Sequence, residues 1–117
     1  MANTFKVVSH DVMPASSGTP EDLYTTPSST TTVVLGMVLA NVHTSQVTTS
    51  VKLVSDTSGG GRAATNTTTF LLKDAPIPVG GTLELLSGNK VVMEATDTLS
   101  LTASGSADIA VSIMEIT

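Results

Sequence analysis

The side chains that could carry out acid–base or nucleophilic chemistry are scattered along this sequence. Glu94 and Asp97 are close enough in sequence to form an acid–base pair. They also flank an expected turn, and we interpret them as the solvated end of a hairpin that Asp97 caps. No serine lies in the Gly-x-Ser-x-Gly frame of a nucleophile elbow. The sequence therefore predicts that the protein is not an enzyme.

Metal, phosphate and cofactor sites are not indicated either. His10 and His43 are far apart, and neither has a second ligand at metal-binding spacing. Asp56 lies among hydroxyl groups that could offer oxygens to calcium, but the segment lacks the acidic residues of a calcium loop. The glycines at 59–61 precede Arg62, without the Gly-Lys-Ser/Thr and the following helix of a phosphate loop. We expect no bound metal and no cofactor.

Composition restricts the class of protein and of partner. A chain of 117 residues corresponds to one domain, and it has no cysteine with which to form a disulfide. Its net charge of −5 argues against nucleic acid or an anionic membrane as a partner, because both attract basic proteins. No apolar run has the length of an export signal or a membrane helix. We expect synthesis in a reducing cytoplasm.

The most apolar stretch of the chain is 30–41, in which three threonines lead into an almost unbroken run of Val, Leu, Met and Ala. Its length and its bounding turn residues predict a strand with both faces covered. A buried helix is the alternative. Thr and Val favour the pleated backbone, and Gly36 would weaken a helix interior by about 1 kcal/mol. We therefore expect the strand.

Alternating apolar and polar residues mark the other elements of the chain. The pattern predicts further strands at 3–9, 23–27, 46–55, 65–74, 82–86, 90–94, 97–103 and 107–116. Ser87, Gly88 and Asn89 indicate a tight hairpin that pairs 82–86 with 90–94. The glycine-rich segment 55–64 is expected to be a mobile hairpin tip, and the prolines of 75–78 indicate an edge strand or a connection.

These elements predict an all-β fold of about eight strands without an amphipathic helix. Short strands with regular Gly, Pro and Asn punctuation are typical of an antiparallel β-sandwich or barrel. We prefer a sandwich with jelly-roll or Greek-key connections, because such a fold tolerates loops of unequal length.

The segment 10–22 is the least regular part of the pattern. It contains Pro14 and Pro20 together with several small residues, so it is either a surface loop or an extended arm that lies across a neighbouring molecule. We therefore divide the chain into an N-terminal strand and Pro-rich arm, 1–22, and a sandwich domain, 23–117.

Several segments of the sequence together carry a resemblance to a known kind of protein. They are Leu23-Tyr24-Thr25-Thr26-Pro27, a Val-rich strand ending at Leu39-Ala40-Asn41, and the segments 71–78, 80–85, 97–104 and 108–115. In this layout the chain resembles small virion structural proteins of tailed bacteriophages, cyanophages among them. The first 22 residues and the glycines at 59–61 lie outside the resemblance.

The resemblance implies a non-enzymatic component of a virion, present in symmetric copies. The expected role is that of a capsid decoration or cement protein, a homotrimer that bridges subunits of the major capsid protein. A neck, tail or baseplate accessory protein, including a fibre attachment piece, is the alternative. A host-surface carbohydrate-binding module that uses Tyr24 and the 55–64 loop is a second alternative, although the chain has few aromatic residues for stacking on sugars.

Bridging two capsid subunits requires a contact on each of them. We expect the contact to come from the N-terminal segment, as an arm or as a strand added to an open sheet edge, within an interface of about 800 Å² per partner. The candidate partner-binding residues are Phe5, Val7, Val12, Met13, Pro14, Pro20 and Tyr24.

Overall fold

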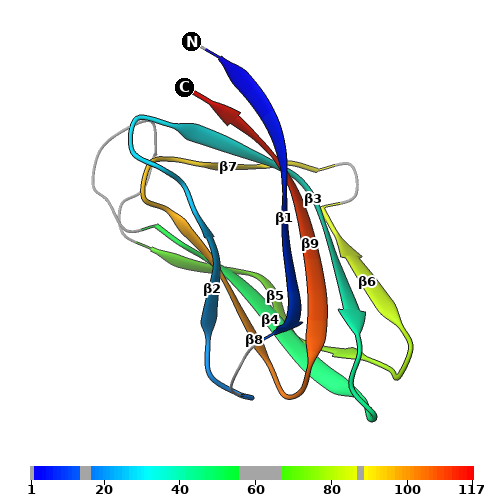
Figure 1. Ribbon diagram of the computed structural model, residues 1–117. Coiled ribbons are helices and arrows are strands. Elements are labelled where there is room, and N and C mark those ends of the chain that lie inside the picture. Colours follow the sequence, from blue (N-terminus) through cyan, green and yellow to red (C-terminus); the bar gives the residue numbers. More distant parts are fainter. Residues whose placement is uncertain (1, 14–16, 56–66, 87–88) are drawn as a thin grey trace.

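The computed structural model describes residues 2–13, 17–55, 67–86 and 89–117, and within them the chain forms nine strands (Figure 1). The strands are β1 (Asn3–Met13), β2 (Glu21–Thr25), β3 (Thr31–Asn41), β4 (Val47–Val54), β5 (Thr68–Ile77), β6 (Thr82–Leu85), β7 (Val91–Met93), β8 (Thr98–Ala103) and β9 (Ala107–Ile116). No described residue belongs to a helix long and apolar enough to cross a membrane.

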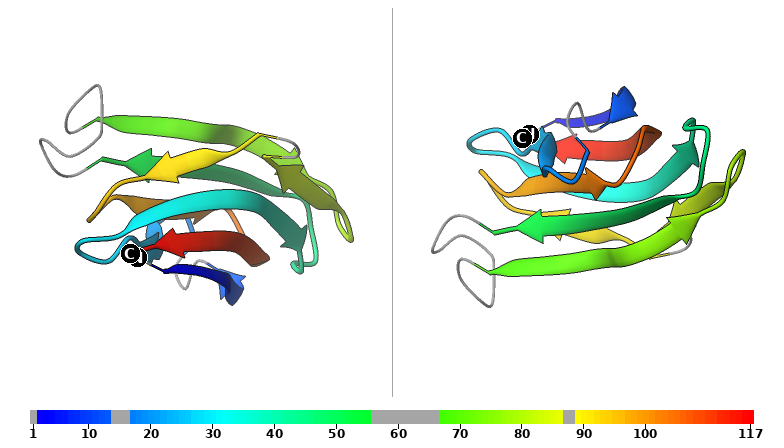
Figure 2. Two further views of the ribbon diagram at one scale, coloured as in Figure 1. Left: turned by 90° about the horizontal axis from the view of Figure 1, so that it is seen from above. Right: turned by 90° about the horizontal axis from the view of Figure 1, so that it is seen from below.

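The strands form two antiparallel sheets packed face to face (Figure 2). The five-stranded sheet has the order β1-β9-β3-β6, with β7 also paired to β3, and the four-stranded sheet has the order β2-β8-β4-β5. The chain thus passes from one sheet to the other after most strands, which is the strand order of a jelly roll. The predicted all-β sandwich is confirmed.

Side chains from the inner faces of both sheets fill the core. The alternation of β9 is clear, because Ile109, Val111 and Ile113 are buried between the sheets as the sequence predicts. Leu99 and Leu101 of β8 oppose them from the other sheet. Each fully buried side chain of this size contributes about 1.5–3 kcal/mol through the hydrophobic effect.

β3 lies in the middle of the five-stranded sheet, between β9 and the pair β6 and β7. The predicted strand is confirmed, but the prediction that both faces are covered was wrong. Met37 and Leu39 are buried in the core, whereas Val38 between them is exposed. The reason is that no described element packs on the outer face of this sheet.

The predicted hairpin between 82–86 and 90–94 was also wrong. β6 pairs with Met37–Ala40 and β7 pairs with Thr32–Val34, so the two short strands follow one another along the same edge of β3. β3 is long enough to accept both. The turn residues Ser87 and Gly88 lie outside the described residues.

The N-terminal segment is more regular than the sequence suggests. β1 pairs with β9 along its length and extends to Met13, so the loop or arm predicted from His10 was wrong as far as that residue. A bulge between His10 and Met13 changes the register, and Val12 there has a positive φ of 51°. The division placed after residue 22 falls inside β2.

Three other predicted features can be located. Pro76 lies in β5, which forms an edge of the four-stranded sheet, in agreement with the edge interpretation of 75–78. The buried carboxylate of Asp97 accepts a hydrogen bond from the Glu94 backbone N–H at 3.0 Å, so Asp97 does cap its turn. The predicted solvated hairpin end was wrong, because Asp97 is buried and this turn joins β7 to β8 of the other sheet. The predicted tip at 55–64 lies outside the described residues from Asp56 onward.

Candidate partner-binding face

The five-stranded sheet carries an apolar row across its outer face. The strand register places Phe5 beside Met114, Met114 beside Val33, and Val33 beside Val92, so the row crosses β1, β9, β3 and β7. Phe5 is 72% exposed and Val92 is 56% exposed, while Met114 and Val33 between them are half-buried. We call these four residues the apolar row.

Further apolar side chains continue this surface toward the middle of the sheet. Val7 on β1 is 66% exposed and Val38 on β3 is 40% exposed, with Ala110 of β9 paired to Val38. Scattered single apolar residues are normal on a protein surface, but four apolar residues aligned across four neighbouring strands indicate an interaction site. The outer face is therefore the strongest candidate binding surface of the described chain.

The inner side of the same strand segments is partly polar. Thr32 and Glu115, sequence neighbours of Val33 and Met114, are buried between the sheets, beside the apolar Val34, Ile113 and Met93. The usual pattern of a half-exposed sheet places apolar residues inside and polar residues outside. At Thr32 and Glu115 this pattern is reversed, and the apolar side chains of the row lie outside the core.

Glu115 is the centre of the inner polar group. Its Oε1 forms an ion pair with the Lys6 ammonium at 2.7 Å, and its Oε2 accepts a hydrogen bond from the Tyr24 hydroxyl at 2.6 Å. The Tyr24 hydroxyl lies 2.8 Å from the Thr32 hydroxyl as well. Because Tyr24 belongs to β2, this group connects the two sheets. We call Lys6, Tyr24, Thr32 and Glu115 the inner polar cluster.

The cluster perturbs the titration of two of its members. Hydrogen bonds from Lys6 and Tyr24, with the positive charge of Lys6, lower the pKa of Glu115. Burial and the hydrogen bond to Glu115 raise the pKa of Tyr24 to about 12. Glu115 is thus held as a carboxylate and Tyr24 as a neutral donor, so that the cluster is satisfied internally.

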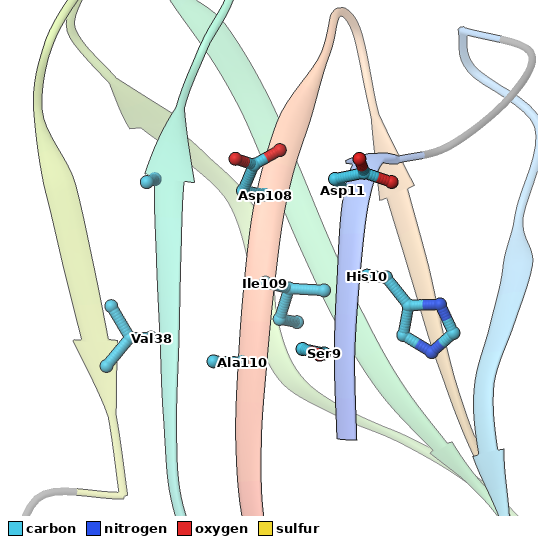
Figure 3. A pocket seen from close by; sticks show the side chains of 8 residues that line it. Ser9, His10, Asp11, Val38, Asp108, Ile109 and Ala110 are labelled. Carbon is cyan, nitrogen blue, oxygen red and sulfur yellow. The ribbon is translucent and has the colours of Figure 1, made fainter. Parts of the chain in front are cut away.

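The opposite end of the outer face is acidic. Asp11 and Asp108, on neighbouring strands, line an open hollow of about 520 Å³ together with Ser9, Val38 and Ala110. Figure 3 shows both carboxylates at the same end of this hollow, while the His10 ring points away from them.

Two of the polar groups at this end have a structural role. The His10 Nε2–H donates to the Leu23 carbonyl oxygen at 2.8 Å, and Asp108 accepts the Val12 backbone N–H at 2.8 Å. In the described part of the chain, no three His, Asp or Glu side chains could hold a metal ion together.

The sequence-predicted partner-binding residues divide between surface and interior. Phe5 and Val7 lie on the outer face, and Val12 and Pro20 are exposed elsewhere. Met13 is buried in the core and Tyr24 belongs to the inner polar cluster, so neither presents a free surface to a partner. Pro14 lies outside the described residues.

Four outer-face residues were missed by sequence reasoning: Val33, Val38, Val92 and Met114. Val33 and Val38 were assigned to a strand covered on both faces, and Met114 to one face of the last strand. The reversed pattern around Glu115 is the signal that could have found them, because a charged residue at an inward position places its apolar neighbours outside.

Comparison with known proteins adds a likeness of fold. No protein-family model and no curated protein matches the chain. A chain in the structure of infectious bursal disease virus, Gx strain, is similar with a TM-score of 0.55 and 9% identity, over 98% of this chain and 33% of that one. This protein therefore spans a third of the viral chain's length. At this identity, the likeness is one of fold alone.

A second solved structure is a chain from Bacillus endospore appendages, described as a family of disulfide-linked pili. It has a TM-score of 0.45 and 15% identity, over 99% of this chain and 87% of that one. A similarity of this size supports no argument about the present protein.

Proposed function

We propose that this protein is a non-enzymatic virion structural protein, and that it decorates the capsid by binding the major capsid protein through its outer face. The observation that carries the proposal is the apolar row, which no described element covers. The arrangement has the composition of an interface core: an apolar row with one aromatic residue, from which the acidic residues of the face are kept apart.

The charges of the outer face indicate the chemistry of the partner surface. Asp11, Glu84 and Asp108 point outward from its described strands, and none of the outward positions of these strands is Lys or Arg. A complementary surface on the capsid is apolar where it meets the row and basic where it meets the acidic end. A second molecule of this protein stacked through the same face would offer no Lys or Arg at the outward positions of its described strands.

Fold and sequence support the same role without deciding it. Jelly rolls recur in viral capsid domains and in lectins, and a fold by itself does not specify a function. The sequence resemblance to bacteriophage virion proteins favours the virion. The carbohydrate-binding alternative loses its main aromatic candidate, because the Tyr24 hydroxyl is engaged by Glu115 and Thr32 inside the sandwich.

The copy number per particle tests the role on the virion. Quantitative mass spectrometry of purified particles should find this protein at a level comparable with the major capsid protein. A far lower level would assign it to the neck, tail or baseplate and overturn the decoration role. Absence from particles would overturn the virion role altogether.

A matched pair of variants tests the binding face itself. Val92→Lys should weaken binding to capsids that lack this protein by tenfold or more, because it removes an apolar contact and opposes a basic surface. A tenfold loss corresponds to about 1.4 kcal/mol, within the range of interface hot spots. Val79→Lys is the control, since Val79 is 59% exposed but lies in the turn after β5. Equal binding by both variants would contradict the proposed face.

A further inference from the structure

The outer edge of β1 has unpaired backbone groups. β1 ends the five-stranded sheet and pairs only with β9, and no described strand continues the sheet beyond it (Figure 2). Ala2 and Thr117 exchange both backbone hydrogen bonds, with N–O distances of 3.3 and 3.0 Å.

That exchange determines which backbone groups of β1 are free to pair. In an antiparallel pair the residues that exchange hydrogen bonds alternate with those that do not. The even-numbered residues of 2–10 therefore bond to β9. The N–H and C=O groups of Asn3, Phe5, Val7 and Ser9 therefore point out from the sheet.

This edge carries only part of the usual protection against pairing: Lys6 is its one inward charge, and its ammonium is held by Glu115 at 2.7 Å. Natural edge strands are short, or carry proline, bulges or charges that prevent another strand from adding. β1 is regular from Asn3 to His10, and its bulge comes only after that point. Phe5 and Val7, the central residues of the open edge, are also the most exposed large apolar side chains of the described chain.

We propose that two copies of this protein pair through β1, antiparallel and across a two-fold axis at Val7, to form a dimer with one continuous sheet. In this register Phe5 faces the partner's Ser9. Phe5 also lies diagonal to the partner's Val7, within reach of an aromatic side chain. The two side chains thus gain apolar neighbours along the strand while remaining on the shared outer face.

Charge and the position of the bulge favour this register over its neighbours. Only registers shifted by two residues keep the outward-pointing backbone groups opposite one another. A shift in one direction sets Lys6 directly against the partner's Lys6. A shift in the other direction pairs only 6–10 of the regular strand and leaves Phe5 outside it. The proposed register sets no like charges directly opposite.

A second copy fits this edge better than an unrelated strand. A two-fold interface is self-complementary, so the same open backbone groups satisfy one another in both directions. The dimer also joins the two outer faces into one surface, with both copies of Phe5 and Val7 near its centre. The proposal rests on the edge geometry and holds whether or not the outer face binds a capsid.

The oligomeric state in solution provides the first test. Sedimentation equilibrium over a range of concentrations should give the mass of a dimer. Val7→Pro should give the mass of a monomer, because it removes an N–H that points away from β9 and so leaves the sheet of the monomer intact. Val7→Thr keeps this N–H and the branched side chain, and should remain a dimer. A monomeric or trimeric wild-type protein would overturn the proposal.

Cysteine cross-linking tests the register without relying on the proline variant. The chain contains no cysteine, so one introduced thiol reports one position. Directly paired strand residues have Cα atoms about 5.5 Å apart, which a disulfide can span. Under mild oxidation Val7→Cys should form a disulfide-linked dimer. Val92→Cys, whose thiol lies at the opposite edge of the same sheet, should stay monomeric in denaturing gels. Equal cross-linking of the two variants would overturn the proposal.

These experiments test capsid binding and dimer formation independently, so that one proposal can be contradicted without the other. Val92→Lys should lose capsid binding while its mass remains that of a dimer. Val7→Pro should lose the dimer while Val92 and the rest of the apolar row stay in place.

Discussion

The two halves of the five-stranded sheet differ in where they place polar and apolar side chains. In the middle of the sheet Leu39 and Val111 point into the core, and small or isolated residues point outward. Near the chain termini Glu115 and Thr32 join the apolar residues that point inward, and Phe5 and Met114 point outward. The middle of the sheet therefore contributes mainly to the core, whereas the terminal end also exposes an apolar row.

The difference also shows how a sandwich tolerates buried polar groups. A buried carboxylate without partners is costly, but Glu115 has Lys6 on one oxygen and Tyr24 on the other. The inner polar cluster therefore replaces apolar packing at this end of the interior. The apolar residues that alternate with Glu115 and Thr32 along these strands therefore lie on the outer face.

The largest expected effect on stability lies in the middle of the sheet. Leu39→Ala should lower the free energy of unfolding by about 2–5 kcal/mol, because it leaves a cavity in a fully buried site. Urea denaturation measures this loss. Val38→Ala is the adjacent control on the exposed face and should cost much less. Similar losses for the two variants would mean that the outer face of β3 is buried in the isolated protein.

The inner polar cluster should give an intermediate effect that depends on pH. Glu115→Gln should cost about 1–3 kcal/mol at neutral pH, because it removes a charge-assisted bond to Lys6. The folded state lowers the pKa of Glu115, so its contribution is complete above the unfolded pKa of about 4.3 and is lost as pH falls through the lower folded value. The difference in the free energy of unfolding between wild type and Glu115→Gln should therefore disappear at acid pH.

Denaturation of both proteins across this pH range measures the effect. Glu84→Gln on β6 is the matched control, because Glu84 is exposed on the outer face. It should change stability by no more than about 0.5 kcal/mol. If the loss of stability in Glu115→Gln stayed constant down to acid pH, the paired carboxylate could not be the cause of that loss.

The apolar row should give the smallest effect on stability and a clear effect on binding. Met114→Thr should change the free energy of unfolding by about 0.5 kcal/mol or less, because the side chain is only half-buried in the protein alone. Capsid binding should nevertheless weaken. Met114→Leu keeps the apolar surface and should retain binding, so a loss with both variants would point to a change of shape instead.

Local patterns predicted much of the fold, because the period of two in a strand is visible in the sequence. The alternation in β8 and β9 correctly placed Leu99, Leu101, Ile109 and Val111 on inward faces. Turn residues separated the strands well enough to favour a jelly roll. The failures lie where the pattern was ambiguous: the run in β3 is apolar on both faces, and β6 and β7 are short enough to pair with each other or with β3.

The candidate site was predicted only in part. Phe5 and Val7 were predicted to bind a partner because they are apolar and lie near the chain start, and both are exposed on the outer face. Tyr24 was assigned to the same role, yet it bonds to Glu115, which lies 91 residues away along the chain. The inner polar cluster and the apolar row both join residues that are far apart along the chain, so a local sequence pattern does not reveal them.

The sequence by itself determined that this protein is an all-β sandwich with alternating faces, because alternation is a local property of each strand. Only the tertiary structure decided that Phe5, Met114, Val33 and Val92 lie in one row, and that β1 presents an open edge. Strand order and register depend on contacts between distant segments. The same apolar side chain belongs to the core or to a binding face according to what those contacts leave uncovered.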